Sequence, residues 1–301
     1  MATAGVEPVS FTPDRKHSPL RLIFAGSLAG AVEAAVTYPF EFAKTRVQLN
    51  RSLPSAQKLG WPPFPSREWY AGCTTLMVGN SLKAGIRFVV YDAYKSLLSD
   101  RNGRISGPGA ILAGFGAGFT ESLLAVTPFE SIKTQLIDDR KRAQPRMKGL
   151  IHGSIVIARE KGLAGFFQGL VPTTARQAAN SATRFGTYGT LRQLVEGRYP
   201  GQKPSSITTF GIGGIAGVVT VYVTMPLDTI KTRMQSLEAR TEYKNSVDCT
   251  ISIARKEGVL VFWAGALPRL GRLTLSGGIV FTIYEKTLDL MEKFDSRSQY
   301  L

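Results

Sequence analysis

Apolar residues are gathered along the chain in about six long stretches, which alternate with polar segments. Residues 204–227 form an uncharged run of 24, and a helix needs about 20 apolar residues to cross a hydrocarbon core of about 30 Å. The stretches 22–40 and 105–129 each carry one acid, Glu33 and Glu121 respectively. We therefore predict that all three stretches cross a membrane as helices.

Three further stretches, 69–99, 171–195 and 264–290, contain several charges within otherwise apolar helical sequence. A soluble helical bundle is the alternative for these segments. Soluble helices present a continuous polar face, whereas these segments carry isolated cations on a narrow face. The pattern therefore favours membrane helices here too. The mean hydropathy of the whole chain is near zero because it averages the apolar stretches with the polar linkers.

An internal repeat organises these stretches. The pattern Pro-x-acid-x-x-Lys, called the Pro motif below, occurs as PFEFAKTR from Pro39, PFESIKTQ from Pro128 and PLDTIKTR from Pro226. Each copy closes an apolar stretch that contains an Ala-Gly pair, and each is followed by a polar linker. An aromatic residue and a glycine then open the next stretch, as WYAG, FFQG and FWAG. Because three such copies are not chance, the chain reads as three repeats.

The repeats predict an all-α membrane protein with six transmembrane helices, two in each of three pseudosymmetric repeats, and short helices in the linkers. We expect an N-terminal tail at 1–17, followed by repeats at 18–103, 104–200 and 201–301. The first linker is rich in proline and lacks the acid and glycine of the other two. Any short helix there should be broken or remodelled.

The Pro motif combines a helix-bending residue with two charges. Proline inside a helix frees a carbonyl and bends the axis, so we expect kinks at Pro39, Pro128 and Pro226. The acid and the lysine lie three residues apart and share one helix face, so each lysine can meet the acid of a neighbouring repeat. The three ion pairs would then form a closed ring, called the ring below. Its residues are Glu41, Lys44, Glu130, Lys133, Asp228 and Lys231. The alternative is a set of solvated pairs within each helix, worth a few tenths of a kcal/mol.

The composition limits the chemistry. The 301 residues include 37 Lys and Arg against 22 Asp and Glu, a net charge of +15. Two cysteines and two histidines provide neither a disulfide framework nor a metal or His-based catalytic centre, so we expect no enzyme, metal or cofactor. The basic excess indicates nucleic acid, an anionic membrane surface or acidic small molecules as partners. The cations are spread along the chain without a nucleic-acid-binding motif, so we expect no nucleic-acid partner. A soluble nucleic-acid-binding protein is the alternative to this interpretation.

The triplicated Pro motif resembles the mitochondrial carrier family, and the resemblance covers nearly the whole chain. It implies a six-helix barrel around a water-filled cavity in the mitochondrial inner membrane. The cavity would open alternately to the two sides of the membrane, so that transport follows an alternating-access mechanism. The Pro-motif charges would form the gate on the matrix side, where the linkers carry short matrix helices. The resemblance also implies a cytoplasmic gate and cardiolipin bound beside the linker helices, and a monomer is sufficient for such a barrel. The cytoplasmic gate would contain Asp92, Lys95, Arg192 and Glu285, with Gly189 and Leu288 departing from the family pattern.

The substrate-facing positions follow from aligning the three even-numbered stretches on Tyr91, Tyr188 and Tyr284. Residues four, eight and eleven to twelve positions before each tyrosine share one helix face, and those that break the three-fold symmetry are candidates for substrate contact. Five cations and four uncharged residues qualify, and a sixth cation, Arg269, lies one turn further along the third of these stretches. They are Lys83, Arg87, Arg176, Arg184, Arg269 and Arg272, with Asn80, Gln177, Asn180 and Ser276.

Several unpaired cations in one membrane cavity require an anion, because Glu33 and Glu121 cannot neutralise them all. The alternative for any single cation is a pair with Glu33, Glu121 or a gate acid, or a contact with phospholipid head groups. Arginine suits carboxylates, so a multiply charged carboxylate is expected. The segments GNSLKAGIRF, RQAANSATRFGTY and PRLGRL resemble tricarboxylate-carrying members of the family. That resemblance implies antiport of citrate or isocitrate for malate or another carboxylate. A dicarboxylate or oxoglutarate carrier, a phosphate or sulfate carrier, and a membrane adaptor without transport are the alternatives.

Overall fold

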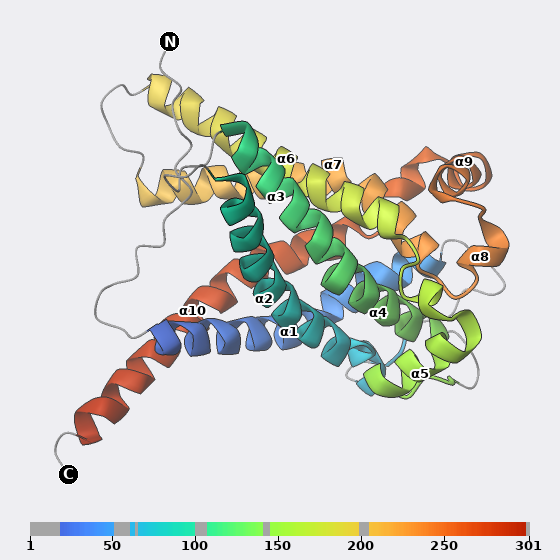
Figure 1. Ribbon diagram of the computed structural model, residues 1–301, viewed down its shortest axis with the longest axis horizontal. Helices are drawn as coiled ribbons and strands as arrows, with labels where there is room; N and C mark the ends of the chain where they lie inside the picture. The colour runs from blue at the N-terminus through green and yellow to red at the C-terminus, as the bar shows by residue number, and fades with distance from the viewer. Residues whose placement is uncertain are drawn as a thin grey trace. The chain divides into compact units, whose positions relative to one another are not determined.

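A computed structural model describes residues 19–50, 61–63, 66–99, 107–140, 145–198 and 205–298. Within these ranges the regular structure is helical and contains no strand (Figure 1). The expected N-terminal tail and most of the Pro-rich first linker lie outside the described residues.

The six apolar stretches each become a long helical segment in the described residues. In chain order they are α1 (Pro19–Asn50), α2 (Cys73–Leu98), α3 to α4 (Gly107–Glu121 and Thr127–Asp139, joined by the π-helical segment η3 at Ser122–Val126), α6 (Leu170–Arg198), α7 (Ser206–Met234) and α10 (Ala266–Ser298). The Pro motifs lie in the C-terminal parts of the first, third and fifth of these six segments. The helices that contain them are α1, α4 and α7.

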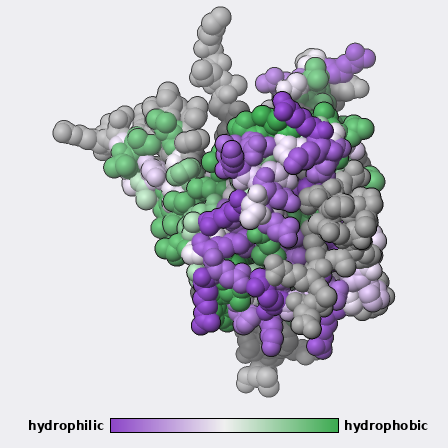
Figure 2. Space-filling model, turned by 90° about the vertical axis from the view of Figure 1, so that its right-hand side faces the viewer, coloured by the Kyte–Doolittle hydropathy of each residue, from purple (hydrophilic) through white to green (hydrophobic). Residues whose placement is uncertain are grey.

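The linkers after the Pro motifs carry the short helices. They are η2 (Arg67–Tyr70), α5 (Leu150–Lys161), η4 (Leu163–Gly165), α8 (Ala239–Glu242), α9 (Ser246–Lys256) and η5 (Val259–Trp263). Helix α5 packs against α4, and α9 packs against α7. Figure 2 looks toward the side of Figure 1 where α5, α8 and α9 lie, and it shows hydrophilic residues gathered on this face.

The three prolines have different local settings. Pro39 and Pro226 lie inside α1 and α7, each of which is assigned as one uninterrupted helix. Pro128 instead lies in the first turn of α4, directly after η3. Proline cannot donate the hydrogen bond that an α-helix requires, and a π-turn is one way to accommodate that loss. The second repeat therefore departs from the other two at the residue where symmetry predicted an equivalent kink.

The described chain forms two compact units, 34–275 and 1–33 with 276–301. Helices α1 and α10 each contribute to both units. In the unit 34–275 the buried apolar residues form three clusters beside the three Pro motifs. The clusters are Tyr38, Phe42, Leu49, Ala71, Cys73 and Ile137; Ile132, Leu136, Met147 and Ile157; and Ile230, Tyr243, Cys249, Ile253, Val261 and Phe262.

The outer faces of α3 and α7 are apolar and exposed. Leu112 on α3, and Phe210, Ile215 and Val223 on α7, are all exposed within the part of the chain that the structure describes. Exposed apolar surface of this extent is typical of contact with a partner or a lipid. Among the described residues, one helix, Thr208–Met234, is long and apolar enough on its own to cross a membrane.

Candidate functional site

Three ion pairs join the Pro-motif helices α1, α4 and α7 into a closed ring. The pairs are Lys44 Nζ with Asp228 Oδ2 at 2.7 Å, Lys133 Nζ with Glu41 Oε1 at 2.6 Å and Lys231 Nζ with Glu130 Oε2 at 2.6 Å. Each lysine reaches the acid of another repeat, so the ring links all three repeats. The side chains in the ring are buried or nearly so, which strengthens ion pairs relative to pairs on a surface.

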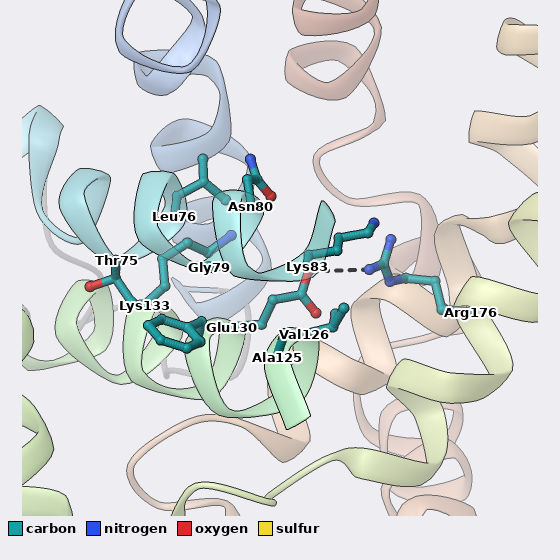
Figure 3. Close-up of a pocket in the computed structure, with 11 residues that line it drawn as sticks. Thr75, Leu76, Gly79, Asn80, Lys83, Ala125, Val126, Glu130, Lys133 and Arg176 are labelled. Atoms are coloured by element: carbon teal, nitrogen blue, oxygen red, sulfur yellow. Dashed lines mark hydrogen bonds and ion pairs between the residues drawn. The ribbon is translucent and has the colours of Figure 1, made fainter. Parts of the chain in front are cut away.

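Two arginines from α6 and α10 bind the same acids. Arg176 Nη2 lies 3.2 Å from Glu130 Oε1, and its Nε lies 3.5 Å from Asp228 Oδ1. Arg272 Nη1 lies 2.9 Å from Glu41 Oε2. Figure 3 shows Arg176 reaching from α6 toward Glu130 on α4. All three ring acids therefore contact a lysine and an arginine.

This pairing corrects part of the sequence interpretation. Arg176 and Arg272 were expected in a set of unpaired cavity cations, but both are bound to ring acids. Lys83 is also paired, with its Nζ 3.5 Å from Glu121 Oε1. Pairing with a gate acid is the alternative that the sequence left open for any single cation, and it holds for these two arginines, which are long enough to reach acids on a neighbouring helix.

Two glutamines support the ring, and the sequence interpretation missed them. Gln48 Nε2 donates to Asp228 Oδ2 at 3.3 Å, and its Oε1 accepts from Thr232 Oγ1 at 2.9 Å. Gln235 Oε1 accepts from Thr134 Oγ1 at 3.2 Å. Both glutamines lie four residues after a Pro-motif lysine, one helical turn further along the same face. Their spacing was a signal available in the sequence, and the second repeat has Ile137 at this position.

Three glycines let the even-numbered helices approach the ring. Gly72, Gly169 and Gly265 come just before α2, α6 and α10 and have φ of +84°, +72° and +87°. A Cβ on Gly72 would lie 3.0 Å from Lys133 Cγ, and a Cβ on Gly265 would lie 3.2 Å from the carbonyl oxygen of Lys44. The positive φ and the close contacts both favour glycine, which explains the glycine of WYAG, FFQG and FWAG.

A cavity of about 470 Å³ lies among α2, α3 and α6. Its polar lining includes the predicted substrate residues Lys83, Gln177, Asn180 and Arg184, together with Glu121. A smaller cavity of about 50 Å³ is lined by Asn80, Lys83, Glu130, Lys133 and Arg176 (Figure 3). Because Lys83 lines both, the two cavities place predicted substrate residues next to the ring.

Arg269 extends this polar region onto α10. Its Nη2 donates to Thr224 Oγ1 at 3.0 Å and lies 3.5 Å from Asn180 Oδ1. The carbonyl of Asn180 faces Arg269, which leaves the amide nitrogen of Asn180 available to the cavity that it lines. Arg269 therefore adjoins the cavity lining from a fourth helix, α10.

The other predicted site residues fall into three groups. The side chains of Arg87, Asp92 and Lys95 lie outside the described residues. Ser276 and Glu285 belong to the unit 1–33 with 276–301, where Ser276 is half-buried and Glu285 is exposed. Arg192, predicted for the cytoplasmic gate, is exposed and pairs with Glu196 of its own helix, Nε to Oε1 at 2.8 Å.

The sequence matches a family of known proteins in three segments. The family described as mitochondrial carrier protein matches residues 15–64, 104–199 and 202–295. Mitochondrial citrate transporter A of Aspergillus niger is 66% identical over 288 residues, which cover 95% of this chain and 97% of that protein.

Other fungal relatives are similar over comparable lengths. A tricarboxylate transporter of Gibberella moniliformis is 52% identical, with 96% of this chain and 94% of the relative covered. The tricarboxylate transport protein of Saccharomyces cerevisiae is 47% identical, with 91% and 96% covered. Together with the segment matches, these identities establish that the chain belongs to the mitochondrial carrier family.

Proposed function

We propose that this protein exchanges citrate or isocitrate for malate or another carboxylate across the mitochondrial inner membrane. As a mitochondrial carrier it is a multi-pass transporter of that membrane, and the similar fungal proteins are named citrate or tricarboxylate transporters. The observation that carries the proposal is the cavity of about 470 Å³, which has Lys83 and Arg184 in its lining and lies beside the ring. Basic and amide groups in one cavity suit a substrate with several carboxylates and a hydroxyl.

The transmembrane arrangement belongs to the same proposal. The six long helical segments would each cross the membrane, two per repeat, with 18–103, 104–200 and 201–301 as the repeats. Their lengths, from 26 residues in α2 upward, suit a core of about 30 Å. The charges that lower the hydropathy of individual helices lie on the ring and in the cavity lining, where protein and water surround them rather than lipid.

The ring is the proposed matrix gate, and it is closed in this structure. Its six charges, five of them buried and Glu130 half-buried, join α1, α4 and α7 by ion pairs. A gate of this kind opens when its ion pairs are replaced by other interactions of similar strength, since leaving buried charges without partners is costly. The substrate supplies those interactions.

Arg176 and Arg272 couple the substrate to the gate. In the closed state they bind Glu130, Asp228 and Glu41. A carboxylate of the substrate offers the same two oxygens as a gate acid and can take over either arginine without changing its charge. The ring acids lose one of their two kinds of cation in this exchange, so substrate binding weakens the gate. A ligand shifts a conformational equilibrium only through such differential contacts.

The same contacts explain why transport would be an exchange. When the gate acids release the arginines and no anion is present, the cavity cations lose their counter-charges and repel one another. The empty carrier therefore resists the change of state, whereas the loaded carrier does not. Cardiolipin beside the linker helices and a monomeric carrier complete the proposal, and native mass spectrometry of the protein extracted with its lipids tests both.

The substrate assignment is tested by competition. Uptake of labelled citrate into liposomes containing the purified protein is measured with unlabelled citrate, isocitrate, malate, oxoglutarate, phosphate or ADP outside. Citrate and isocitrate should compete most strongly and ADP should not compete. Stronger competition by oxoglutarate or malate than by citrate would favour the dicarboxylate alternative, and absence of any uptake would favour the non-transporting adaptor.

A further inference from the structure

The three tryptophans of the chain all lie in the linkers that precede α2 and α10. Trp61 is the most exposed of them, at 54%. Its ring stacks on that of Trp69, with 5.7 Å between the centroids and 13° between the planes. Trp69 Nε1 in turn donates to the carbonyl oxygen of Pro62 at 3.1 Å. The stack and the hydrogen bond together hold Trp61 at a definite place near the start of α2.

Trp69 separates Trp61 from the apolar core. The ring of Trp69 lies 5.5 Å from that of Phe42 on α1 and packs against the cluster that contains Phe42. The inner ring of the stack therefore covers the core, and the outer ring presents an aromatic face outward. An exposed indole that the core does not need is best explained by a partner outside the chain.

An apolar stripe runs along α2 from the end where Trp61 lies. Val78, Leu82 and Val89 are exposed, and their spacing of four and seven residues places them on one face of the helix. Tyr70, just before the helix, is exposed as well. Because the chain is a multi-pass protein of the mitochondrial inner membrane, we expect such a stripe on a long helix to face lipid.

An exposed aromatic ring also precedes each of α2, α6 and α10. These rings are Tyr70, Phe167 and Trp263, each two residues before a glycine with positive φ. Aromatic side chains of membrane proteins concentrate at the two interfaces between lipid and water. The rings therefore indicate that an interface lies level with the starts of these three helices, which is where Trp61 is held.

The linkers of the second and third repeats each expose a pair of apolar residues on a helix. The pairs are Ile151 with Ile155 on α5 and Val247 with Ile251 on α9. Such a face, on a helix with cations in its last turn, is typical of helices that lie in a membrane interface. Counted back from the aromatic-glycine pair, the first repeat has Pro54 and Lys58 at these positions, so its sequence lacks the apolar pair.

We propose that Trp61 inserts into the interfacial region of the leaflet on the linker side and anchors the first linker there. The partner is the phospholipid surface, with the indole ring among the upper parts of the acyl chains and its N–H toward the head groups. Arg67, which is exposed in the same linker, is available to anionic head groups. The inference rests on the membrane location of the chain and does not depend on the substrate.

Fluorescence quenching tests the inference in two proteins that each retain a single tryptophan. One keeps Trp61 and carries Trp69→Phe with Trp263→Phe. The matched control keeps Trp69 and carries Trp61→Phe with Trp263→Phe. Both are reconstituted into phosphatidylcholine vesicles whose lipid is brominated either close to the head group or close to the ends of the acyl chains. Iodide, present on both sides of the membrane, is the water-soluble quencher, and circular dichroism checks that each protein is folded.

Lipid brominated close to the head group should quench the emission of Trp61 by roughly half or more, since the interface is where tryptophan resides. It should quench Trp69 much less, because that ring is half-buried behind the stack. Quenching of Trp61 by iodide alone would show a ring in water, and no quenching by either agent would show a ring covered by protein. Either result would overturn the inference, and so would equal quenching of the two tryptophans or stronger quenching by bromine at the chain ends.

A second comparison serves if a single-tryptophan protein does not fold. The parent chain and its Trp61→Phe variant are then measured in the same brominated vesicles. The substitution should remove most of the emission that lipid bromine quenches, because Trp61 is more exposed than the other two tryptophans. An unchanged lipid-quenched part would contradict the insertion of Trp61.

Discussion

Arg272 Nη1 lies 2.9 Å from Glu41 Oε2, while the other oxygen of the same carboxylate accepts from Lys133. Glu41 thus joins α1 to α4 through the lysine and to α10 through the arginine. Lys44 of its own helix is a third cation, with its Nζ 3.6 Å from Glu41 Oε1. One carboxylate is therefore shared by the gate and by an arginine that the substrate would use.

Replacing Glu41 should damage the protein more than replacing one of its lysine partners. Glu41→Gln leaves Lys133, Lys44 and Arg272 facing one another without the acid, whereas Lys133→Gln leaves Glu41 with two cations. Thermal unfolding of the detergent-solubilised variants measures the difference. Glu41→Gln should have the lower midpoint temperature, and an equal or higher midpoint would contradict the shared role of this carboxylate.

Arg184→Ala should reduce citrate exchange by roughly ten- to a hundred-fold, because a cation that pairs with a substrate carboxylate contributes about 1.5–3 kcal/mol. Arg184 is an exposed residue in the lining of the larger cavity, so its removal should leave folding and membrane insertion intact. Initial rates of citrate uptake into liposomes measure the effect.

Arg146→Ala is the matched control for Arg184→Ala. Arg146 pairs with Glu160 on the exposed surface near α5, Nη1 to Oε1 at 2.7 Å, and lines neither cavity. Its loss should leave exchange within about two-fold of the parent, since exposed ion pairs contribute little. Equal losses in both variants would show that Arg184 acts through the overall charge rather than at the cavity.

The fold was largely predictable because it follows from periodic features. Three copies of the Pro motif and the apolar stretches specify the long helices, and the aromatic-glycine pairs mark the starts of α2, α6 and α10. The π-helical segment before Pro128 was not predicted, because the neighbouring sequence resembles that before the other two prolines. Such a local change depends on packing between helices rather than on the residues of one turn.

The site was predictable only where residues of one repeat determine it. The ring charges are named by the motif, and helix spacing identifies the cavity residues Lys83, Gln177, Asn180 and Arg184. The pairing of Arg272 with Glu41 joins positions 231 residues apart, and no local pattern specifies it. The contact of Gln48 on α1 with Thr232 on α7 likewise joins distant positions. The sequence does show that Gln48 lies one helical turn after Lys44, but not which residue it contacts.

Gly265→Ala should destabilise the protein more than Gly258→Ala. Both glycines have positive φ, +87° and +90°, so alanine at either position is strained. Only Gly265 has its missing Cβ against Lys44, at 3.2 Å from the backbone oxygen, whereas the Cβ position at Gly258 is open. The difference in unfolding midpoint between the two variants isolates the contact with α1. Equal midpoints would mean that the close approach of α10 to Lys44 does not contribute.

Cys249 on α9 should be unreactive in the folded protein. Burial raises the pKa of its thiol to about 12, whereas an unfolded cysteine ionises near pH 8.5. Below about pH 8.5 the thiol is neutral in both states, and above it the unfolded state gains stability by ionising, so the contribution of Cys249 to folding falls as pH rises toward about 12. Maleimide labelling at pH 8 followed by mass spectrometry should modify Cys249 only after denaturation. Rapid labelling of the native protein would show that α9 does not bury this thiol.

The central claim is that cavity cations and the ring together carry out obligatory exchange of a tricarboxylate. Uptake of labelled citrate is therefore measured in liposomes that contain the purified protein and are preloaded with citrate, malate, oxoglutarate, phosphate, ADP or nothing. The account predicts uptake that requires internal citrate or malate and is absent from empty liposomes and from those loaded with ADP. Equal uptake into empty liposomes would contradict obligatory exchange, and exchange of oxoglutarate or malate without citrate would contradict the tricarboxylate assignment.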